Sequence, residues 1–335
     1  MNYFVTDSIN KDDISNNNKL HYLKNSTNLN WENLNYSMNS RGGRFQLIFN
    51  RQIKPFFIGL KILKKRKEIN NIIFLQQFFG ICFAFWCKLF KVKKNFNVEI
   101  ITFIYKEKKG LIGKLYKKFI NFAVNSGYID KIICFSKYEK EYYIKLFNTK
   151  IFKNINLGIE DLSNQYMNEY KKGDFFLAVG RSNRDYEFLK TNYNYSKKLI
   201  ILCNAIDSNV ENKNIEIYNN VFGKDYLKLL SKCFGVIIPL KDVNVSSGQL
   251  VMLQAMMMKK PIIITKANTI NDYVKNDFNS IIIDKTKESL DNAIMKLENE
   301  EYYEKLISNG RKFFMDNFTE EQMMNEIGKE MLKIE

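Results

Sequence analysis

Residues 234–265, FGVIIPLKDVNVSSGQLVMLQAMMMKKPIIIT, hold two short apolar runs with consecutive isoleucines on either side of a helical pattern. Apolar runs of this length, joined by one helix, are typical of parallel strands that are buried on both faces. The stretch therefore predicts a strand–helix–strand unit. We expect the helix to begin at the second serine, Ser247, and to bury Leu250, Leu253 and Met257.

The same alternation extends along the chain on both sides of this unit. Downstream of residue 174, further strands are expected at 175–180, 198–204, 214–219 and 280–284, with helices at 184–193 and 225–233. In the first half, strands are expected at 71–77, 96–105 and 131–136, with helices at 50–68, 78–90, 112–126 and 137–147. Residues 10–45 resist assignment. The predicted class is α/β, with two Rossmann-like, doubly wound parallel sheets that face a cleft.

The length of the chain, its cysteine content and its longest apolar run limit the classes of protein to which it can belong. At 335 residues the chain is longer than most single domains, and the polar run at 161–174 predicts a crossing between two domains. Its five cysteines are scattered and lack zinc-site spacing, which predicts a reducing, cytoplasmic setting. The longest apolar run, residues 78–87, is too short to cross a bilayer and is expected to be a buried helix, with a monotopic membrane contact as the alternative.

The net charge of +16 is confined to the first half of the chain. Residues 1–150 carry 27 Lys and Arg against 10 Asp and Glu, whereas the remaining residues carry 25 against 26. This asymmetry predicts a negatively charged partner for the first domain, either an anionic membrane surface or nucleic acid.

The segment Ser246-Ser247-Gly248-Gln249 follows a predicted strand and opens a predicted helix. Helix amino termini expose unpaired N–H groups and a positive partial charge, and a glycine there lets an anion approach the backbone. Gln254 lies seven residues after Ser247, on nearly the same helical face, where it would meet the nucleoside sugar, the ribose, of a bound diphosphate. The alternative is that one of the serines only caps the helix.

A second loop, GRSNRD at 180–185, supplies the cations Arg181 and Arg184 at the end of a predicted strand. Guanidinium groups suit phosphate recognition, although surface charge is the simpler explanation for either residue alone. The chain has no metal-binding motif and a single histidine, His21, so we expect a metal-independent site without a cofactor. Phosphate-binding loops of the G-x-x-x-x-G-K-[ST] and G-x-G-x-x-G types are also absent, which disfavours kinases, ATPases and dehydrogenases.

Several ordered segments resemble retaining glycosyltransferases of the GT-B fold, family 4 (group 1) in particular. They include FFLAVGRSNRDYEFLK, the opening stretch, the closing FFMDNFTEEQMMNEI, and the INLGIED segment at 155–161. The resemblance implies an acceptor-binding domain at 1–155, a nucleotide-sugar domain at 156–315, and a carboxyl-terminal helix at 316–335 that crosses back to the first domain.

The resemblance also implies roles for particular residues. Arg181 and Arg184 would stabilise the donor diphosphate and are the catalytic candidates. The donor-binding candidates are Asn244, Ser246, Ser247, Gly248, Gln249, Gln254 and Thr265, with Asn268 beside them. A glycine-containing loop with Gly42, Gly43 and Arg44, together with Gln77 and Tyr105 at strand ends, would face the donor and acceptor from the first domain.

Two departures from the family pattern concern the donor. The family commonly carries two glutamates with seven residues between them, and these places hold Ser246 and Gln254. The usual phosphate-binding lysine falls on Tyr186, so Arg184 is expected to supply that charge instead. An SSGQ pattern of this kind is similar to a polysaccharide-biosynthesis subtype, and loss of activity is the alternative.

Together these observations predict a hexosyltransferase that uses a nucleoside-diphosphate sugar, with UDP-sugar expected, and retains the anomeric configuration. The expected acceptor is a glycan or polyprenyl-linked oligosaccharide for a cell-surface polysaccharide such as a capsule, at the inner face of the cell membrane. Two other classes stay open: a basic nucleic-acid-binding protein, and a catalytically silent GT-B partner subunit.

Overall fold

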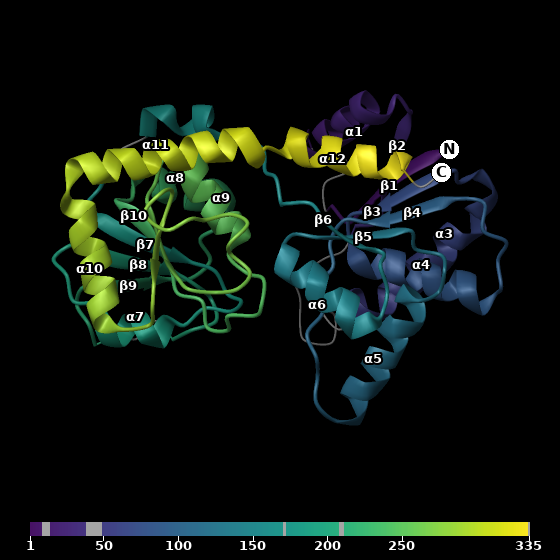
Figure 1. Cartoon of the computed structure of the whole chain (residues 1–335), viewed down its shortest axis with the longest axis horizontal. Helices are drawn as coiled ribbons and strands as arrows, with labels where there is room; N and C mark the ends of the chain where they lie inside the picture. The colour runs from purple at the N-terminus through teal and green to yellow at the C-terminus, as the bar shows by residue number, and fades with distance from the viewer. Residues whose placement is uncertain (9–13, 38–48, 170–171, 208–210, 334–335) are drawn as a thin grey trace. The chain divides into compact units, whose positions relative to one another are not determined.

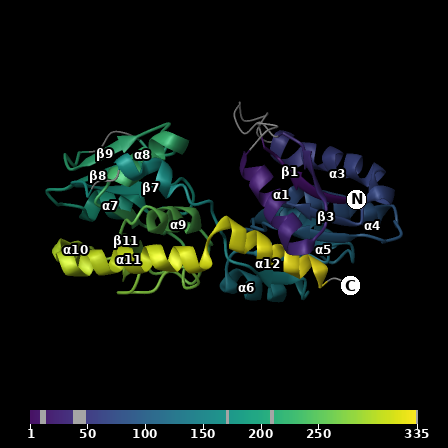
Figure 2. The same ribbon diagram turned by 90° about the horizontal axis from the view of Figure 1, so that it is seen from above.

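The computed structural model describes residues 1–8, 14–37, 49–169, 172–207 and 211–333, and it divides into two compact units. Unit 1 comprises Met1–Asn156 together with Glu321–Glu335, and unit 2 comprises Leu157–Glu320. Each unit contains one six-stranded parallel sheet with helices on both faces, as Figure 1 and Figure 2 show. The predicted α/β class with two doubly wound parallel sheets is confirmed.

The sheet of unit 1 has the strand order β2-β1-β3-β4-β5-β6, and every pairing is parallel. The strands are β1 (Asn2–Thr6), β2 (Trp31–Asn35), β3 (Asn71–Phe74), β4 (Asn97–Ile100), β5 (Lys131–Cys134) and β6 (Phe152–Asn154). Because right-handed crossovers from β3 to β6 all move in one direction, their connecting helices cover one face of the sheet.

That face carries α3 (Lys54–Lys64), α4 (Gln77–Leu89), α5 (Gly110–Val124) and α6 (Lys137–Phe147), whose buried side chains form one core with the strands. A π-helical turn, Phe49–Ile53, precedes α3, and a 3-10 turn, Arg66–Glu68, follows it. The opposite face carries α1 (Ile14–Thr27) and α12 (Glu320–Leu332), which lie side by side in Figure 1 and Figure 2. Gly328 makes this approach possible, since a Cβ there would lie 2.1 Å from the Ser26 hydroxyl oxygen.

Unit 2 repeats the design with the strand order β12-β11-β10-β7-β8-β9. Its strands are β7 (Phe175–Val179), β8 (Lys198–Leu202), β9 (Ile215–Tyr218), β10 (Gly235–Ile238), β11 (Ile262–Thr265) and β12 (Ile281–Ile283). A 3-10 turn, Ser163–Glu169, precedes β7. The α-helices of unit 2 are α7 (Tyr186–Asn192), α8 (Gly223–Lys232), α9 (Gln249–Met257), α10 (Lys287–Glu298) and α11 (Glu300–Asn317). Alternate side chains of each strand point to opposite faces of the sheet and pack into two hydrophobic cores, one beneath α8 and α9 and one beneath α7 and α10.

Most of the expected elements are present, although the strand expected at 96–105 ends at Ile100 and the helix expected at 50–68 is α3, Lys54–Lys64, with short turns on either side. The helix expected at 137–147 is present with these bounds, because the Ser136 side chain caps its start and Asn148 ends it in a left-handed conformation. The expected helix at Ser247 begins instead at Gln249. The unassigned region around 10–45 contains α1 and β2, and β1 precedes it.

One buried charge stands out in unit 1. Glu99, in the middle of β4, is fully buried, and neither of its carboxyl oxygens has a hydrogen-bond partner among the described residues. Its neighbours Val98 and Ile100 pack with the α3–α6 core, so Glu99 faces the other side of the sheet. There Lys131 pairs with Glu330 of α12, at 3.2 Å between Nζ and Oε2. Burial raises the pKa of Glu99 to about 8, Lys131 opposes the rise, and Glu330 and Asp130 add to it.

Substitution of Glu99 by Gln therefore tests whether ionisation of this carboxyl group lowers the free energy of unfolding. The unfolded chain ionises near its ordinary pKa of 4.5, whereas the folded chain resists ionisation up to about 8, so wild-type stability falls with pH across that window. We expect Glu99→Gln to match the wild type near pH 4.5 and to be more stable by a few kcal/mol at pH 8. Urea unfolding at a series of pH values measures this difference, and parallel curves for both proteins would contradict it.

Candidate functional site

In unit 2, the loops after β7 and β10 are joined by one asparagine. Asn183 donates from Nδ2 to the carbonyl oxygens of Asp242 (2.9 Å) and Val245 (3.3 Å), and its Oδ1 accepts the Asp242 N–H at 2.7 Å. Its φ of 55° is left-handed, a conformation that asparagine tolerates better than most residues. The carboxyl ends of these two strands therefore present a single, braced surface.

Arg184 lies between the two loops and is bound only by neutral oxygens. Its Nε donates to Val179 O at 2.9 Å, and its Nη1 donates to Ser182 O at 3.0 Å and to Ser247 Oγ at 2.9 Å. Within the described residues, no carboxylate forms an ion pair with it. Burial lowers the pKa of Arg184, yet a guanidinium stays charged at neutral pH. The guanidinium packs so closely on Gly180 that a Cβ there would lie 2.8 Å from Nη2.

The start of α9 meets this guanidinium. Gly248 is the residue before the helix, with a φ of 93°, and no side chain caps the helix there. An added Cβ would lie 3.6 Å from Arg184 Nη2. The hydroxyl of Ser247 is engaged by Arg184 and donates to Ser182 O at 3.1 Å, and Ser246 Oγ accepts from Gln249 Nε2. The structure therefore places a cation beside an uncapped helix amino terminus, which suits an anion.

The burial of α9 corrects one expectation from the sequence. Leu253 and Met257 are buried as expected, but Leu250 is 50% exposed. Val251 and the remaining apolar residues of α9 are also buried, so the helix is covered on nearly every side. Gln254 is half-buried and lies one turn after Leu250, so these two residues form the open stripe of the helix. The glutamine is thus on the accessible side and not among core residues.

The remaining donor-binding candidates lie around the same loop but differ in accessibility. Asn244 is exposed, and its Oδ1 accepts from Asn268 Nδ2 at 2.7 Å. Thr265 is 1% exposed, and its hydroxyl accepts the Leu240 N–H at 2.7 Å and approaches Leu240 O at 3.3 Å. Thr265 therefore joins β11 to the loop after β10, and its hydroxyl is already occupied by backbone groups.

Arg181 lines a separate pocket of about 370 Å³ at the carboxyl ends of β7, β8 and β9. The side chains of Asn204, Tyr218, Asn220 and Phe222 contribute to its wall, and Phe222 is 58% exposed. These four residues were not predicted from the sequence. A signal for them was present in the sequence, because each lies at or just after the end of a predicted strand and parallel strands bring such positions to one edge.

The two described candidates in unit 1 were expected at strand ends, but Gln77 begins α4 and Tyr105 lies in the loop after β4, and the side chains of both make structural contacts. Gln77 pairs with the backbone of Ile104, whose N–H donates to Oε1 at 2.7 Å. Tyr105 is 7% exposed and stacks on Tyr116 with ring centroids 5.6 Å apart. Gly42, Gly43 and Arg44 lie outside the described residues.

Three further observations concern the described part of the chain. It contains no group of three or more His, Cys, Asp or Glu side chains placed to hold a metal ion. None of its helices combines the length and the apolar character that a membrane span requires. All five cysteines are buried free thiols.

Comparison with known proteins gave one matching family model, over part of unit 2, and a set of similar structures. Residues 202–313 match the model of glycosyl transferases group 1. Three similar structures are Anabaena Alr3699/HepE in complex with UDP-glucose (TM-score 0.68, 13% identity, 99% of each chain), sucrose-phosphate synthase from Thermosynechococcus elongatus (0.69, 12%, 99% of this chain and 98% of that chain), and WaaG, a glycosyltransferase involved in lipopolysaccharide biosynthesis (0.64, 12%, 99% of each). A comparison with curated protein sequences gave no match.

The chain has the same fold as these three structures, which is the GT-B fold expected from the sequence, and the segment that matches the group 1 model lies in unit 2.

Substitution of Thr265 by Val tests whether this residue is structural or binds the donor. The change removes the acceptor of the buried Leu240 N–H and keeps the side-chain shape, so we expect a loss of about 1–3 kcal/mol in unfolding free energy. The affinity of the folded protein for UDP, measured by calorimetry, is expected to stay within twofold of the wild type. A large loss of UDP affinity without a loss of stability would instead make Thr265 a binding residue.

Proposed function

We propose that this enzyme transfers a hexosyl group from a UDP-sugar to a glycan or lipid-linked oligosaccharide acceptor with retention of configuration, in the biosynthesis of a cell-surface polysaccharide. The observation that carries the proposal is Arg184, a charged group held by three neutral oxygens beside the uncapped start of α9. A half-buried cation without a carboxylate partner is costly unless a ligand supplies the negative charge. A nucleoside diphosphate supplies it.

In this proposal the diphosphate lies at the amino terminus of α9, between Arg184 and the N–H groups that follow Gly248. The Arg181 pocket takes the uracil and its ribose, since it offers the amides of Asn204 and Asn220 together with the rings of Tyr218 and Phe222. Gln254, on the open stripe of α9, lies one to two turns beyond the phosphates, within reach of a sugar. Alr3699/HepE, which has this fold, has been crystallised with UDP and with UDP-glucose, which supports the assignment.

The chemistry that these residues supply is stabilisation of charge. The bond between the anomeric carbon and the phosphate oxygen breaks, and the acceptor oxygen bonds to that carbon on the same face. The acceptor proton passes to the leaving phosphate oxygen. Arg184 and the dipole of α9 stabilise the negative charge that develops on the diphosphate. The proposed reaction uses no protein side chain as a base, because the leaving phosphate oxygen takes the proton, and it is proposed to be metal-independent.

The acceptor and the location are proposed from two facts. WaaG shares the fold and acts in lipopolysaccharide biosynthesis. The first half of this chain is strongly basic, which suits an anionic membrane surface at the inner face of the cell membrane. A capsule or a similar polysaccharide is the proposed product, made on a polyprenyl-linked acceptor.

The direct test is turnover with a panel of nucleotide sugars and a polyprenyl-linked glycan acceptor, followed by NMR of the product. We expect turnover with a UDP-sugar and an anomeric coupling constant that matches the donor. An inverted product would refute retention. Absence of both UDP binding and donor hydrolysis would favour the silent-subunit alternative.

Substitution of Arg184 by Met separates binding from folding. The change removes a partly desolvated charge but also its three hydrogen bonds to neutral oxygens, and because these two effects oppose one another we expect only a small change in thermal stability. UDP affinity should fall about 10- to 100-fold, because a charge-assisted contact to phosphate is lost. Calorimetry and thermal unfolding on the same samples measure both effects.

Two comparison variants sharpen this test. Lys305→Met removes an exposed cation on α11, away from the loops that surround Arg184, and should leave UDP affinity unchanged. Arg181→Ala should weaken UDP binding less than Arg184→Met does, since Arg181 is exposed and lines the pocket beside the phosphate site. If Arg184→Met binds UDP as the wild type does, the assignment of Arg184 fails.

A further inference from the structure

The helical layer of unit 1 carries an apolar band on the side that faces away from the sheet. Phe56 of α3, Phe85 of α4 and Phe119 of α5 contact one another, with ring centroids 5.2–5.8 Å apart. Phe85 also meets Phe122 of α5 at 5.6 Å. These rings are only partly buried or exposed, whereas the inward residues of the same helices are fully covered.

The band continues to the amino-terminal end of α5, where three apolar side chains are exposed to solvent. Leu111, Ile112 and Leu115 are 73%, 78% and 58% exposed. With Phe119 and Phe122 they follow helical spacing along one side of α5, so they form a stripe and not scattered contacts. At the other end of the band, Trp86 stacks on Phe90, which is 57% exposed. We call this surface the aromatic band; it consists of Phe56, Phe57, Phe85, Trp86, Phe90, Leu111, Ile112, Leu115, Phe119 and Phe122.

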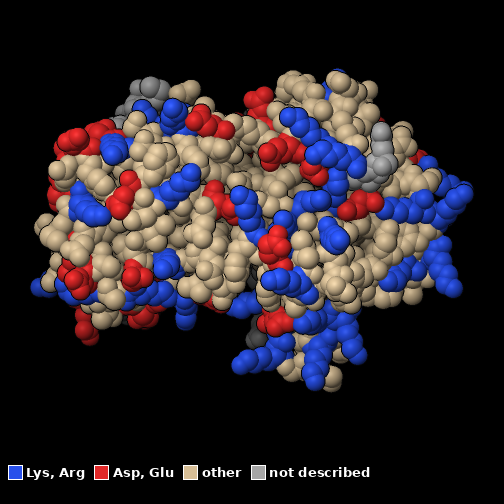
Figure 3. All heavy atoms as spheres, in the orientation of Figure 1, with Lys and Arg blue, Asp and Glu red and all other residues tan. Residues whose placement is uncertain are grey.

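Lysines surround the aromatic band. Residues 49–126 contain 17 Lys and Arg against 3 Asp and Glu, and one of these three, Glu99, is buried on the other side of the sheet. Lys88 lies over the ring of Phe122 at 4.5 Å, and Lys114 and Lys118 are exposed on α5 beside the apolar stripe. Figure 3 shows lysine and arginine side chains gathered around the α5 end of unit 1, with uncharged atoms between them.

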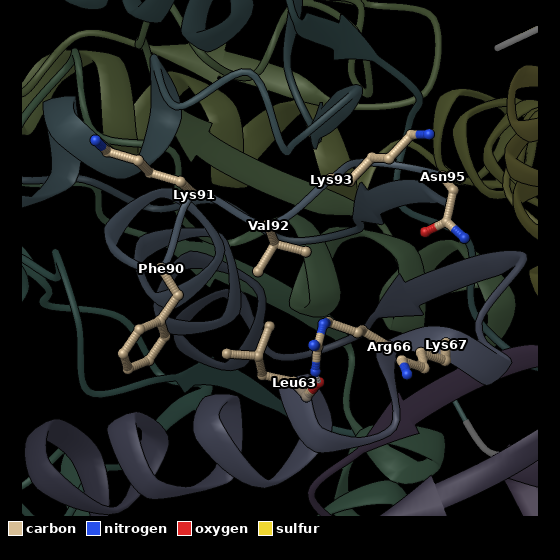
Figure 4. Close-up of a pocket in the computed structure, with 8 residues that line it drawn as sticks. All are labelled: Leu63, Arg66, Lys67, Phe90, Lys91, Val92, Lys93 and Asn95. Carbon is tan, nitrogen blue, oxygen red and sulfur yellow. Dashed lines mark hydrogen bonds between the residues drawn. The ribbon is translucent and has the colours of Figure 1, made fainter.

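A basic pocket of about 680 Å³ lies at the Phe90 end of the aromatic band. Its wall includes Leu63 and Val92 together with the cations Arg66, Lys67, Lys91 and Lys93. Figure 4 shows that Lys91 and Lys93 extend in opposite directions, so these cations do not converge on one point. Such an arrangement suits many dispersed anions better than one phosphate group.

From this combination we infer that the aromatic band inserts into the interface of an anionic lipid bilayer, with the surrounding lysines on its headgroups. The inference names the surface for the membrane location proposed above and rests on that proposal. Aromatic and aliphatic side chains flanked by lysine, without a spanning helix, are the pattern of proteins that lie on a membrane. The dispersed positive charge complements anionic headgroups across the whole surface. A second copy of this chain would bring the same basic face and would be repelled.

The two tryptophans of the chain make a direct test possible, because one of them lies in the aromatic band. In a Trp31→Phe background, Trp86 is the single tryptophan reporter. Vesicles of phosphatidylglycerol and phosphatidylcholine should shift Trp86 emission to shorter wavelength, and acyl chains brominated near the headgroup should quench it. Vesicles of phosphatidylcholine alone should bind at least tenfold more weakly. Vesicle binding without quenching would place the contact elsewhere and overturn the inference.

Variants of the full chain supply the matched comparison. We expect Leu111→Ser/Ile112→Ser/Leu115→Ser and, separately, Lys114→Glu/Lys118→Glu to reduce co-sedimentation with anionic vesicles at least tenfold. Met295→Ser and Lys305→Glu/Lys312→Glu alter exposed residues of unit 2 and should bind as the wild type does. Equal binding by all variants would refute the inference.

Two controls separate this inference from its alternatives. UDP affinity should be unchanged in the α5 variants. Loss of vesicle binding with UDP binding intact would support the aromatic band as the lipid-binding surface. Absence of UDP binding in the wild type would count against the proposed enzymatic function alone. Sedimentation velocity without lipid should give the same species for wild type and triple variant. A wild-type dimer that the triple variant abolishes would assign the aromatic band to a second copy and overturn the lipid assignment.

Discussion

The most constraining interaction in unit 2 is the placement of one guanidinium among neutral oxygens. Arg184 joins the end of β7, through Val179 O, to the residue before the α9 cap, through Ser247 Oγ. Gly180 has no side chain where the guanidinium packs, and Tyr186 donates its hydroxyl to Gly180 O at 2.6 Å, which fixes the same turn. Because the charge is partly desolvated and no ion pair from the described part of the chain offsets it, binding of an anion here would stabilise the two loops.

The two units divide the physical tasks between them. Unit 2 is nearly neutral, and its proposed phosphate site consists of a few fixed groups: one guanidinium, a helix terminus and a braced loop. Unit 1 carries almost all of the net charge, dispersed over long, exposed side chains around apolar rings. Fixed dipoles select one ligand in one orientation, whereas dispersed charge holds a surface without selecting a single headgroup.

Sequence reasoning succeeded where local patterns matched the final environment. The isoleucine runs at β10 and β11 are buried on both faces, as a continuous apolar run requires. It failed at β1 and α1, because β1 is placed by non-local parallel pairing with β2 and β3, and α1 has little apolar periodicity. Leu250 was expected in the core because it is apolar, and its exposure depends on the tertiary packing of α9. No local pattern distinguishes Arg184, which meets α9, from the exposed Arg181 three residues earlier.

The position of Arg184 beside Ser247 gives a physical reason for a neutral residue at position 246. The family pattern commonly places a glutamate there, one residue before Ser247, whose hydroxyl lies 2.9 Å from Arg184 Nη1. A carboxylate so near would attract this guanidinium and weaken its hold on a diphosphate. With Ser246 bound to Gln249 and with Gln254 in the second glutamate position, the full charge of Arg184 is left for the ligand. In the proposed reaction, recognition of the donor would then depend on hydroxyl and amide groups, which donate and accept hydrogen bonds without competing for the cation.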